Sequence, residues 1–190
     1  MMISKSEAAE ALRDMKQVHR RTSAGSAYAK ASPHLVLGGV LWAIGYAACG
    51  LLPPERWGSV WVPIGLVGAI ASYIVALRAQ RSVASNPAAG AVQAAHILWL
   101  IATTMAFIAT CLLLFQPADP LVFLAFPGLV AAFVYVLLGS LGLPRFRWIG
   151  AAMFALLILG LIVEREAIAF WIAAAGGGGL VLGGLWLRRA

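Results

Sequence analysis

The residues best suited to metal or redox chemistry are two histidines and two cysteines that share one spacing. Cys49 follows His34 by fifteen residues, and Cys111 follows His96 by fifteen residues. A pair of imidazoles can bind a transition metal ion or change charge near neutral pH. No third or fourth ligand lies at a matching spacing, so we interpret His34 and His96 as helix-end or packing residues, with a metal site as the alternative. We therefore predict no cofactor.

The two cysteines cannot complete such a metal site if each histidine and its cysteine lie on one helix. Fifteen helical residues rise about 22 Å, which is far longer than any metal–ligand bond. A disulfide between Cys49 and Cys111 is possible where both face an oxidising compartment. The alternative is a pair of small buried thiols in helix contacts, and the sequence leaves the two readings open.

Recognisable catalytic motifs are missing from the sequence. It holds no His-Glu-x-x-His, Gly-x-Ser-x-Gly or Cys-x-x-Cys pattern, and its long apolar runs contain no Asp, Glu, Lys or Arg. Ionisable groups inside a membrane usually mark a proton relay or an ion path. We therefore predict a protein that is not an enzyme. A transporter would have to line its path with polar residues such as Ser72, Thr103, Thr104 and Tyr135.

The elements that must position all these residues are membrane-spanning helices. The chain has 190 residues, of which 62% are hydrophobic and 11% charged, and its mean hydropathy is +0.91. That is more apolar surface than one small soluble core can bury. A helix crosses a hydrocarbon layer of about 30 Å with roughly 20 apolar residues. Six uncharged runs are of about this size, at residues 33–53, 57–77, 93–115, 121–143, 148–163 and 167–187. We expect an all-α integral membrane protein with six transmembrane helices.

The basic residues lie mostly on one side of these six runs. Twelve of the fourteen Lys and Arg residues fall before the first run, after the second and fourth, or after the sixth. Only Arg56 and Arg165 fall on the other side. Because basic segments stay in the cytoplasm, both termini are expected there, with the chain in a bacterial inner (plasma) membrane. This topology accounts for the net charge of +7, so no nucleic-acid partner is predicted.

Residues 1–32 form a separate basic segment in this interpretation, ahead of a transmembrane domain at 33–190. Ser4 and Glu7 have the spacing of a capping box, which predicts a short amphipathic helix in the cytoplasm or on the membrane surface. Ser32 and Pro33 are typical of the start of a new helix. The bases of the segment could contact anionic lipid or a cytosolic protein, or could only enforce topology. They are Arg13, Lys16, Arg20 and Arg21.

A weak internal repeat suggests that the six runs are three hairpins. Gly-Leu-Val recurs at Gly65, Gly128 and Gly179, in the returning run of each hairpin. In the last run, Ala175, Gly179 and Gly183 add a stripe of small residues spaced by four, which lets neighbouring helices approach closely. We predict that these five residues are packing positions, and that Gly179 in particular is gripped by another helix.

Two stretches of the sequence resemble an uncharacterised group of small bacterial six-helix inner-membrane proteins. These stretches are RRTSAGSAYAKASPHLVLGGVLWAIGYAACG and the closing AAAGGGGLVLGGLWLRRA. The length and three-hairpin layout are also similar to the HdeD-like acid-resistance membrane proteins. Neither resemblance implies an activity, a cofactor or a functional residue.

The function predicted from these observations is that of a non-enzymatic multi-pass membrane protein that works through contacts. It would be a stress-related or regulatory component whose basic segment meets a cytosolic regulator, or it would act as a homo-oligomer within the lipid bilayer. The alternative is a small transporter or channel subunit for a neutral or small solute. A polar cavity at the middle of the membrane would favour that alternative, and a sealed apolar interior would favour the first.

Overall fold

The computed structural model of the chain describes the backbone of residues 5–82, 87–163 and 165–189. It describes the side chains of residues 12–15, 22–75, 99–163 and 165–189. The described backbone consists of helices and short connections and contains no strand, so the predicted all-α class is confirmed. The main helices are α1 (Lys5–Leu51), α2 (Trp57–Ser82), α3 (Pro87–Phe115), α4 (Pro120–Ser140) and α5 (Pro144–Val163).

The last span is built from three helical pieces rather than one. It begins with α6 (Ile168–Trp171), continues as a π-helix, η2 (Ile172–Gly177), and ends as α7 (Gly178–Leu187). A short 3-10 helix, η1 (Pro54–Arg56), precedes α2. Wide π turns of this kind are uncommon and occur mostly as local insertions in α-helices. The glycine-rich run of the sequence therefore lies inside a helix and forms no loop.

Five helical stretches are long and apolar enough to cross a membrane, which supports a multi-pass membrane protein. They are Thr22–Leu51, Pro54–Val75, Pro120–Ser140, Pro144–Val163 and Ile168–Leu187. The predicted third span, 93–115, lies in α3. The part of it whose side chains are described, Trp99–Phe115, is a shorter apolar helix. A sixth crossing thus stays a prediction.

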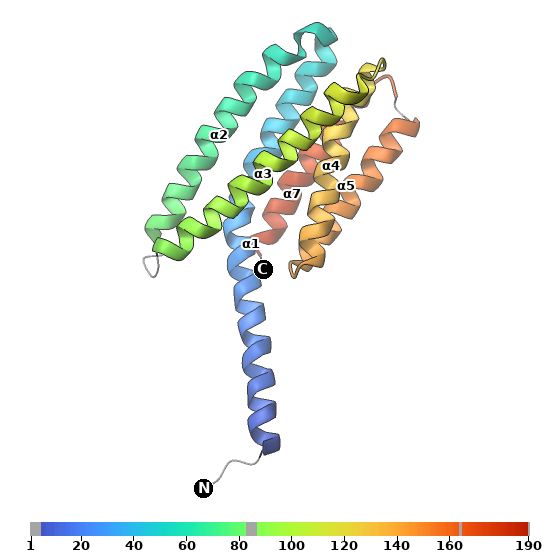
Figure 1. Ribbon diagram of the computed structural model, residues 1–190. Helices are drawn as coiled ribbons and strands as arrows, with labels where there is room; N and C mark the ends of the chain where they lie inside the picture. The colour runs from blue at the N-terminus through green and yellow to red at the C-terminus, as the bar shows by residue number, and fades with distance from the viewer. Residues whose placement is uncertain (1–4, 83–86, 164, 190) are drawn as a thin grey trace.

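Helix α1 differs from the predicted start of the first span. It runs without a break from Lys5 to Leu51 and contains Pro33 in its interior. No helix begins at Ser32. Its fully buried hydroxyl does not cap a helix and instead donates to the carbonyl oxygen of Gly184, 2.7 Å away in α7. The first part of α1 projects alone beyond the other helices, as Figure 1 shows.

Two helix pairs, α1 with η2 and α7, and α4 with α5, make the most extensive contacts in the bundle. Glycines bring the backbones of both pairs together. A methyl group on Gly39 would lie 2.6 Å from the carbonyl oxygen of Gly177, and one on Gly150 would lie 2.5 Å from the carbonyl oxygen of Ala132. The predicted hairpins pair the first span with the second, the third with the fourth and the fifth with the sixth. The tightest packing is therefore between spans of different hairpins.

The buried side chains form two clusters, one in each half of the bundle. One cluster includes Tyr28, Phe146 and Leu187, near the ends of the helices that carry most of the bases. The other includes Tyr46, Leu157 and Ile172, toward the opposite ends. We call these two ends the basic end, with Lys30, Arg145, Arg147, Arg188 and Arg189, and the far end, with Glu55, Arg56, Asp119, Arg165 and Glu166. The start of α1 and the end of α7 both lie toward the basic end (Figure 1).

Helices α2 and α3 lie at the edge of this bundle. The apolar window of α2 has none of its residues buried, and the side chains of Trp99 and Phe115 on α3 are about three-quarters exposed. Apolar surface of this extent is suited to lipid contact, because lipid tails are as apolar as the side chains that meet them. The core that positions the basic end is therefore made by α1, α4, α5 and the last span.

Candidate functional site at the base of α1

The place where α1 leaves the bundle is held by an arginine between two aromatic rings. The guanidinium carbon of Arg145 lies 4.9 Å from the ring centre of Trp186 and 5.7 Å from that of Tyr28. Its Nη1 also donates to the carbonyl oxygen of Trp186, at 2.9 Å. A cation above an aromatic face is attracted by the negative charge density of the ring. Arg145 therefore joins the start of α5 to α1 and to the end of α7.

Two further hydrogen bonds tie α1 down at the same level. The backbone N–H of Arg145 donates to the Tyr28 hydroxyl at 3.2 Å, and Ser32 donates to Gly184 one turn further along α1. Gly184 has no room for a side chain, since a methyl group there would lie 2.7 Å from Val36. We call Tyr28, Ser32, Arg145, Gly184 and Trp186 the α1 clamp.

A stack of aromatic rings supports the clamp from beneath. Phe146 is buried, its ring centre lies 6.0 Å from that of Tyr28, and it stacks on Tyr135 of α4 at 5.7 Å. Aromatic pairs at these distances add specific attraction to the burial of apolar area. Because α1, α4, α5 and α7 all contribute, the direction in which α1 leaves the bundle is fixed by the core.

The part of α1 beyond the clamp presents apolar and charged side chains together. Leu12 and Met15 are exposed, and Arg13 and Asp14 lie exposed between them. Of the predicted contact residues, Arg13 is therefore accessible on the projecting helix. The side chains of Lys16, Arg20 and Arg21 lie outside the described residues.

The predicted histidine and cysteine sites are not assembled in the part of the chain whose side chains are described. His34 is partly buried in α1, and His96 lies outside the described side chains. No group of three metal-binding side chains occurs among those described. Cys49 and Cys111 are both free thiols. The first lies on α1 and is buried against neighbouring helices, and the second lies on α3 at the edge of the bundle. The possible disulfide between these two residues stays a prediction.

The polar residues that a solute path would need are used for local hydrogen bonds. Thr103 and Thr104 donate to the carbonyl oxygens of Trp99 and Leu100 in their own helix. Such bonds are the usual state of threonine in membrane helices. Tyr135 stacks within the aromatic support of the clamp. Neither of two pockets among the described residues includes any of these side chains or Ser72.

The predicted packing residues divide into two groups. Methyl groups on Gly128 and Gly183 would lie 3.0 Å from Leu157 and Ile149, so both face a neighbouring helix as expected. Gly65 and Gly179 face open space, since methyl groups there would meet no described atom within 4 Å. Ala175 lines a groove together with Gly179. The expected grip on Gly179 is absent because that face of the helix points away from α1.

The residues that do bring α1 and the last span together were missed by the sequence interpretation. They are Ser32 and Gly39 in α1, and Gly177 and Gly184 in the last span. In each helix the two residues are seven apart. A spacing of seven keeps small residues on one side of a helix over two turns, and this signal could have identified the contact. The four-residue spacing chosen instead follows a different face.

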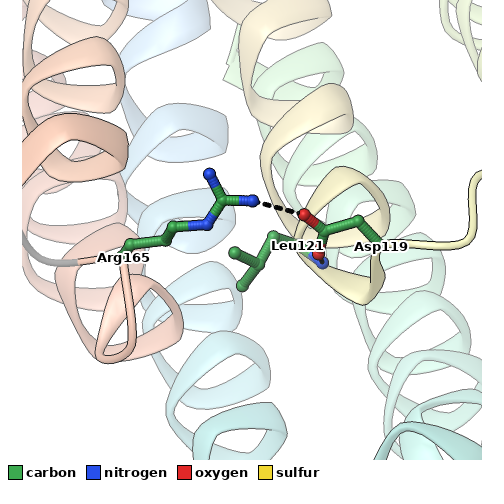
Figure 2. Close-up of polar contacts among 3 residues, drawn as sticks. All are labelled: Asp119, Leu121 and Arg165. Atoms are coloured by element: carbon green, nitrogen blue, oxygen red, sulfur yellow. Dashed lines mark hydrogen bonds and ion pairs between the residues drawn. The ribbon is translucent and has the colours of Figure 1, made fainter.

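The far end is joined by a smaller polar contact. Figure 2 shows the Arg165 guanidinium directed at the carboxylate of Asp119, at 2.6 Å. The same carboxylate accepts from the backbone N–H of Leu121 at 2.9 Å, which caps the start of α4. Because the side chains of Arg165 and Asp119 are 67% and 41% exposed, the ion pair contributes about 0–1 kcal/mol to the free energy of unfolding.

Comparison of the chain with known protein families, characterised proteins and solved structures finds no match. The resemblances drawn from its two ends therefore stay predictions, and its function has to be argued from its own geometry.

Proposed function

We propose that this protein is a non-enzymatic membrane protein that docks a cytosolic regulatory protein on the projecting part of α1. The observation that carries the proposal is the continuity of α1 from Lys5 to Leu51, together with the clamp around Tyr28 and Arg145. At about 1.5 Å per residue, the part of α1 before Thr22 extends roughly 25 Å beyond the candidate span.

The clamp favours a protein partner over a flat membrane contact. A helix that lies on a bilayer has to run in the plane of the headgroups. Helix α1 is instead held along the direction of its own span by contacts before Pro33, at Tyr28 and Ser32, and after it, where Gly39 meets Gly177. Leu12 and Met15 then face water, where a partner could bury them. Helices with paired apolar residues and flanking charges are a common mode of groove recognition.

A cytoplasmic location of this helix rests on the charge distribution. Five bases gather at the basic end, whereas the carboxylates after Thr22 fall in the loops at the far end. By the positive-inside rule, this distribution favours a cytoplasmic location for the projecting helix and both termini, in a bacterial inner membrane that the chain would cross six times. A regulatory or stress-related role follows if binding of the partner is controlled.

Photocrosslinking in cells tests the proposal. A photoreactive amino acid replaces Met15, and a matched control replaces Leu141, an exposed residue in the turn between α4 and α5 at the same end of the bundle. We expect an adduct of one defined mass from position 15 that position 141 does not give. Adducts with lipid alone, or equal patterns from both positions, would refute the docking role.

A second pair of variants tests whether the rigid connection matters. Gly25 lies in α1 just before the clamp, and a side chain there would meet no described atom within 4 Å. Gly25→Pro should kink the helix and weaken the adduct from position 15, because proline removes a hydrogen bond and clashes with the preceding turn. Gly25→Ala should leave the adduct unchanged. An adduct that survives the proline shows that the direction of α1 has no part in docking.

A further inference from the structure

An apolar groove lies between α5 and the last span, and it shares Trp186 with the clamp. Trp148, Met153 and Leu156 line one wall, and Ala175, Gly179 and Trp186 line the other. Its volume is about 330 Å³. The groove exists because Gly179 has no side chain, and that position has no described neighbour within 4 Å.

Two arginines lie directly on the tryptophans at the mouth of this groove. The guanidinium carbon of Arg145 is 4.9 Å from the ring centre of Trp186, and that of Arg147 is 5.7 Å from the ring centre of Trp148. Arg188 and Arg189 follow Trp186 at the end of the last span and are exposed. Tryptophan and arginine side by side are typical of the level of the lipid headgroups.

Carboxylates that could neutralise these arginines lie elsewhere in the sequence. The four acidic residues after Thr22 all fall in the connections at the far end. The arginines at the mouth of the groove thus form an electropositive surface next to an apolar groove. An anionic phospholipid has the complementary arrangement, with a phosphate above a hydrocarbon chain.

The length of the groove suits one acyl chain better than a second helix. Along α5 it extends from Trp148 to Leu156, and along the last span from Trp186 to Ala175. These stretches rise about 12 and 16 Å, close to half of a hydrocarbon layer of about 30 Å. A helix from another copy would cross both leaflets and would need contacts along the whole span. The groove therefore matches the depth of a single leaflet.

We propose that this groove binds one acyl chain of an anionic phospholipid, with the lipid phosphate held by Arg145 and Arg147. This site requires no cytosolic partner, but it shares Arg145 and Trp186 with the clamp, so Arg147 and Gly179 are the positions that test it separately from docking. Basic pockets between membrane helices are known to select anionic headgroups, and each arginine near such a headgroup is expected to change affinity about fivefold.

Native mass spectrometry of the purified protein in detergent micelles tests the site. The probes are dioleoyl phosphatidylglycerol and dioleoyl phosphatidylcholine, which have the same chains and differ in headgroup charge. We expect phosphatidylglycerol to bind at least about fivefold more tightly. Arg147→Gln should reduce binding of phosphatidylglycerol about fivefold without affecting phosphatidylcholine. Gly179→Leu should weaken both lipids, because a leucine side chain would occupy the groove.

Gly65→Leu is the matched control for the groove variant. Gly65 also has open space around it, but it lies on α2, away from the groove. This variant should bind both lipids like the unmodified protein. Thermal unfolding of the two leucine variants checks that each is folded. If Gly179→Leu does not fold, Arg147→Gln still tests the headgroup contact.

Three results would overturn the lipid site. The first is equal affinity of the unmodified protein for the two lipids, and the second is unchanged phosphatidylglycerol binding in a folded Gly179→Leu variant. The third is a dimer in micelles that Gly179→Leu converts to a monomer, because a second copy of the chain would then occupy the groove.

Discussion

Replacement of Gly177 by alanine tests the close contact between α1 and the last span. The new methyl group would lie 2.8 Å from the backbone nitrogen and Cβ of Ala43 and 2.8 Å from the carbonyl oxygen of Gly39. Carbon atoms in good contact are about 3.5–4.0 Å apart, so the two helices would have to separate by nearly 1 Å. Because two of the three atoms belong to the α1 backbone, no side-chain rotation can relieve the clash.

The expected size of the effect follows from two opposing contributions. Overpacking of this kind costs about 1–3 kcal/mol of the free energy of unfolding. Alanine in place of glycine within a helix returns about 1 kcal/mol, since it restricts the unfolded chain. The net loss for Gly177→Ala is therefore about 0–2 kcal/mol. Gly179→Ala has the same gain without the clash, because the new methyl group meets no described atom within 4 Å.

The informative quantity is thus the difference between the two alanine variants. The gain from helix propensity is common to both, so Gly177→Ala should be about 1–3 kcal/mol less stable than Gly179→Ala. Titration with sodium dodecyl sulfate in mixed micelles, followed by circular dichroism, measures both free energies of unfolding. Gly39→Ala, which places a methyl group on the other side of the contact, should resemble Gly177→Ala. Equal stabilities for the variants at 177 and 179 would show that α1 and the last span do not meet in this way.

Three other contacts give predictions of smaller size. Arg145→Gln should lower the free energy of unfolding by about 1 kcal/mol and should loosen α1, so that a spin label at Met15 becomes more mobile. Arg145→Lys should leave that label equally mobile, because lysine lacks the planar group that covers both rings. Tyr46→Phe should cost about 1 kcal/mol by loss of the buried bond to the Leu124 carbonyl oxygen, and an unchanged unfolding midpoint would contradict that bond. At the far end, Asp119→Asn should change stability by less than about 1 kcal/mol, since asparagine still caps α4, whereas Asp119→Ala should cost about 0.5–2 kcal/mol; equal losses would contradict the capping role.

The far ends of the helices could be read from the sequence almost to the residue. Helices end at Leu51, Phe115 and Val163, close to the predicted limits at 53, 115 and 163. Pro53 and Pro54 follow the first of these positions, and Gln116 and Pro117 follow the second. Such pairs of proline or polar residues are typical of turns, whereas the single Pro33 lies inside α1. The local sequence is therefore enough to predict where the helices stop at the far end.

The basic ends were placed less well, for a physical reason. Hydropathy measures how much of a helix can lie in lipid, and helices do not stop where the bilayer does. Arginine, lysine and alanine are good helix formers in water. Helix α2 accordingly continues to Ser82, and α1 begins at Lys5 instead of at Pro33. The clamp could not be predicted for a different reason, since it joins residues such as Tyr28 and Arg145 that are far apart in the chain.

The glycine run shows what a sequence can and cannot decide about packing. Four consecutive glycines make a helix thin on every side. The run therefore predicts that a neighbouring helix packs closely, but it does not indicate on which face. The face is chosen by α1, whose Ser32 and Gly39 are seven residues apart and meet Gly184 and Gly177. Gly179 lies two residues beyond Gly177, about 200° around an α-helix, and so points away from α1. One short run thereby supplies two surfaces: Gly177 lets α1 approach and fixes the docking helix, and Gly179 leaves the groove in which we place a lipid chain. Substitutions at 177 should therefore change the stability of the fold, and substitutions at 179 should change what the folded protein binds.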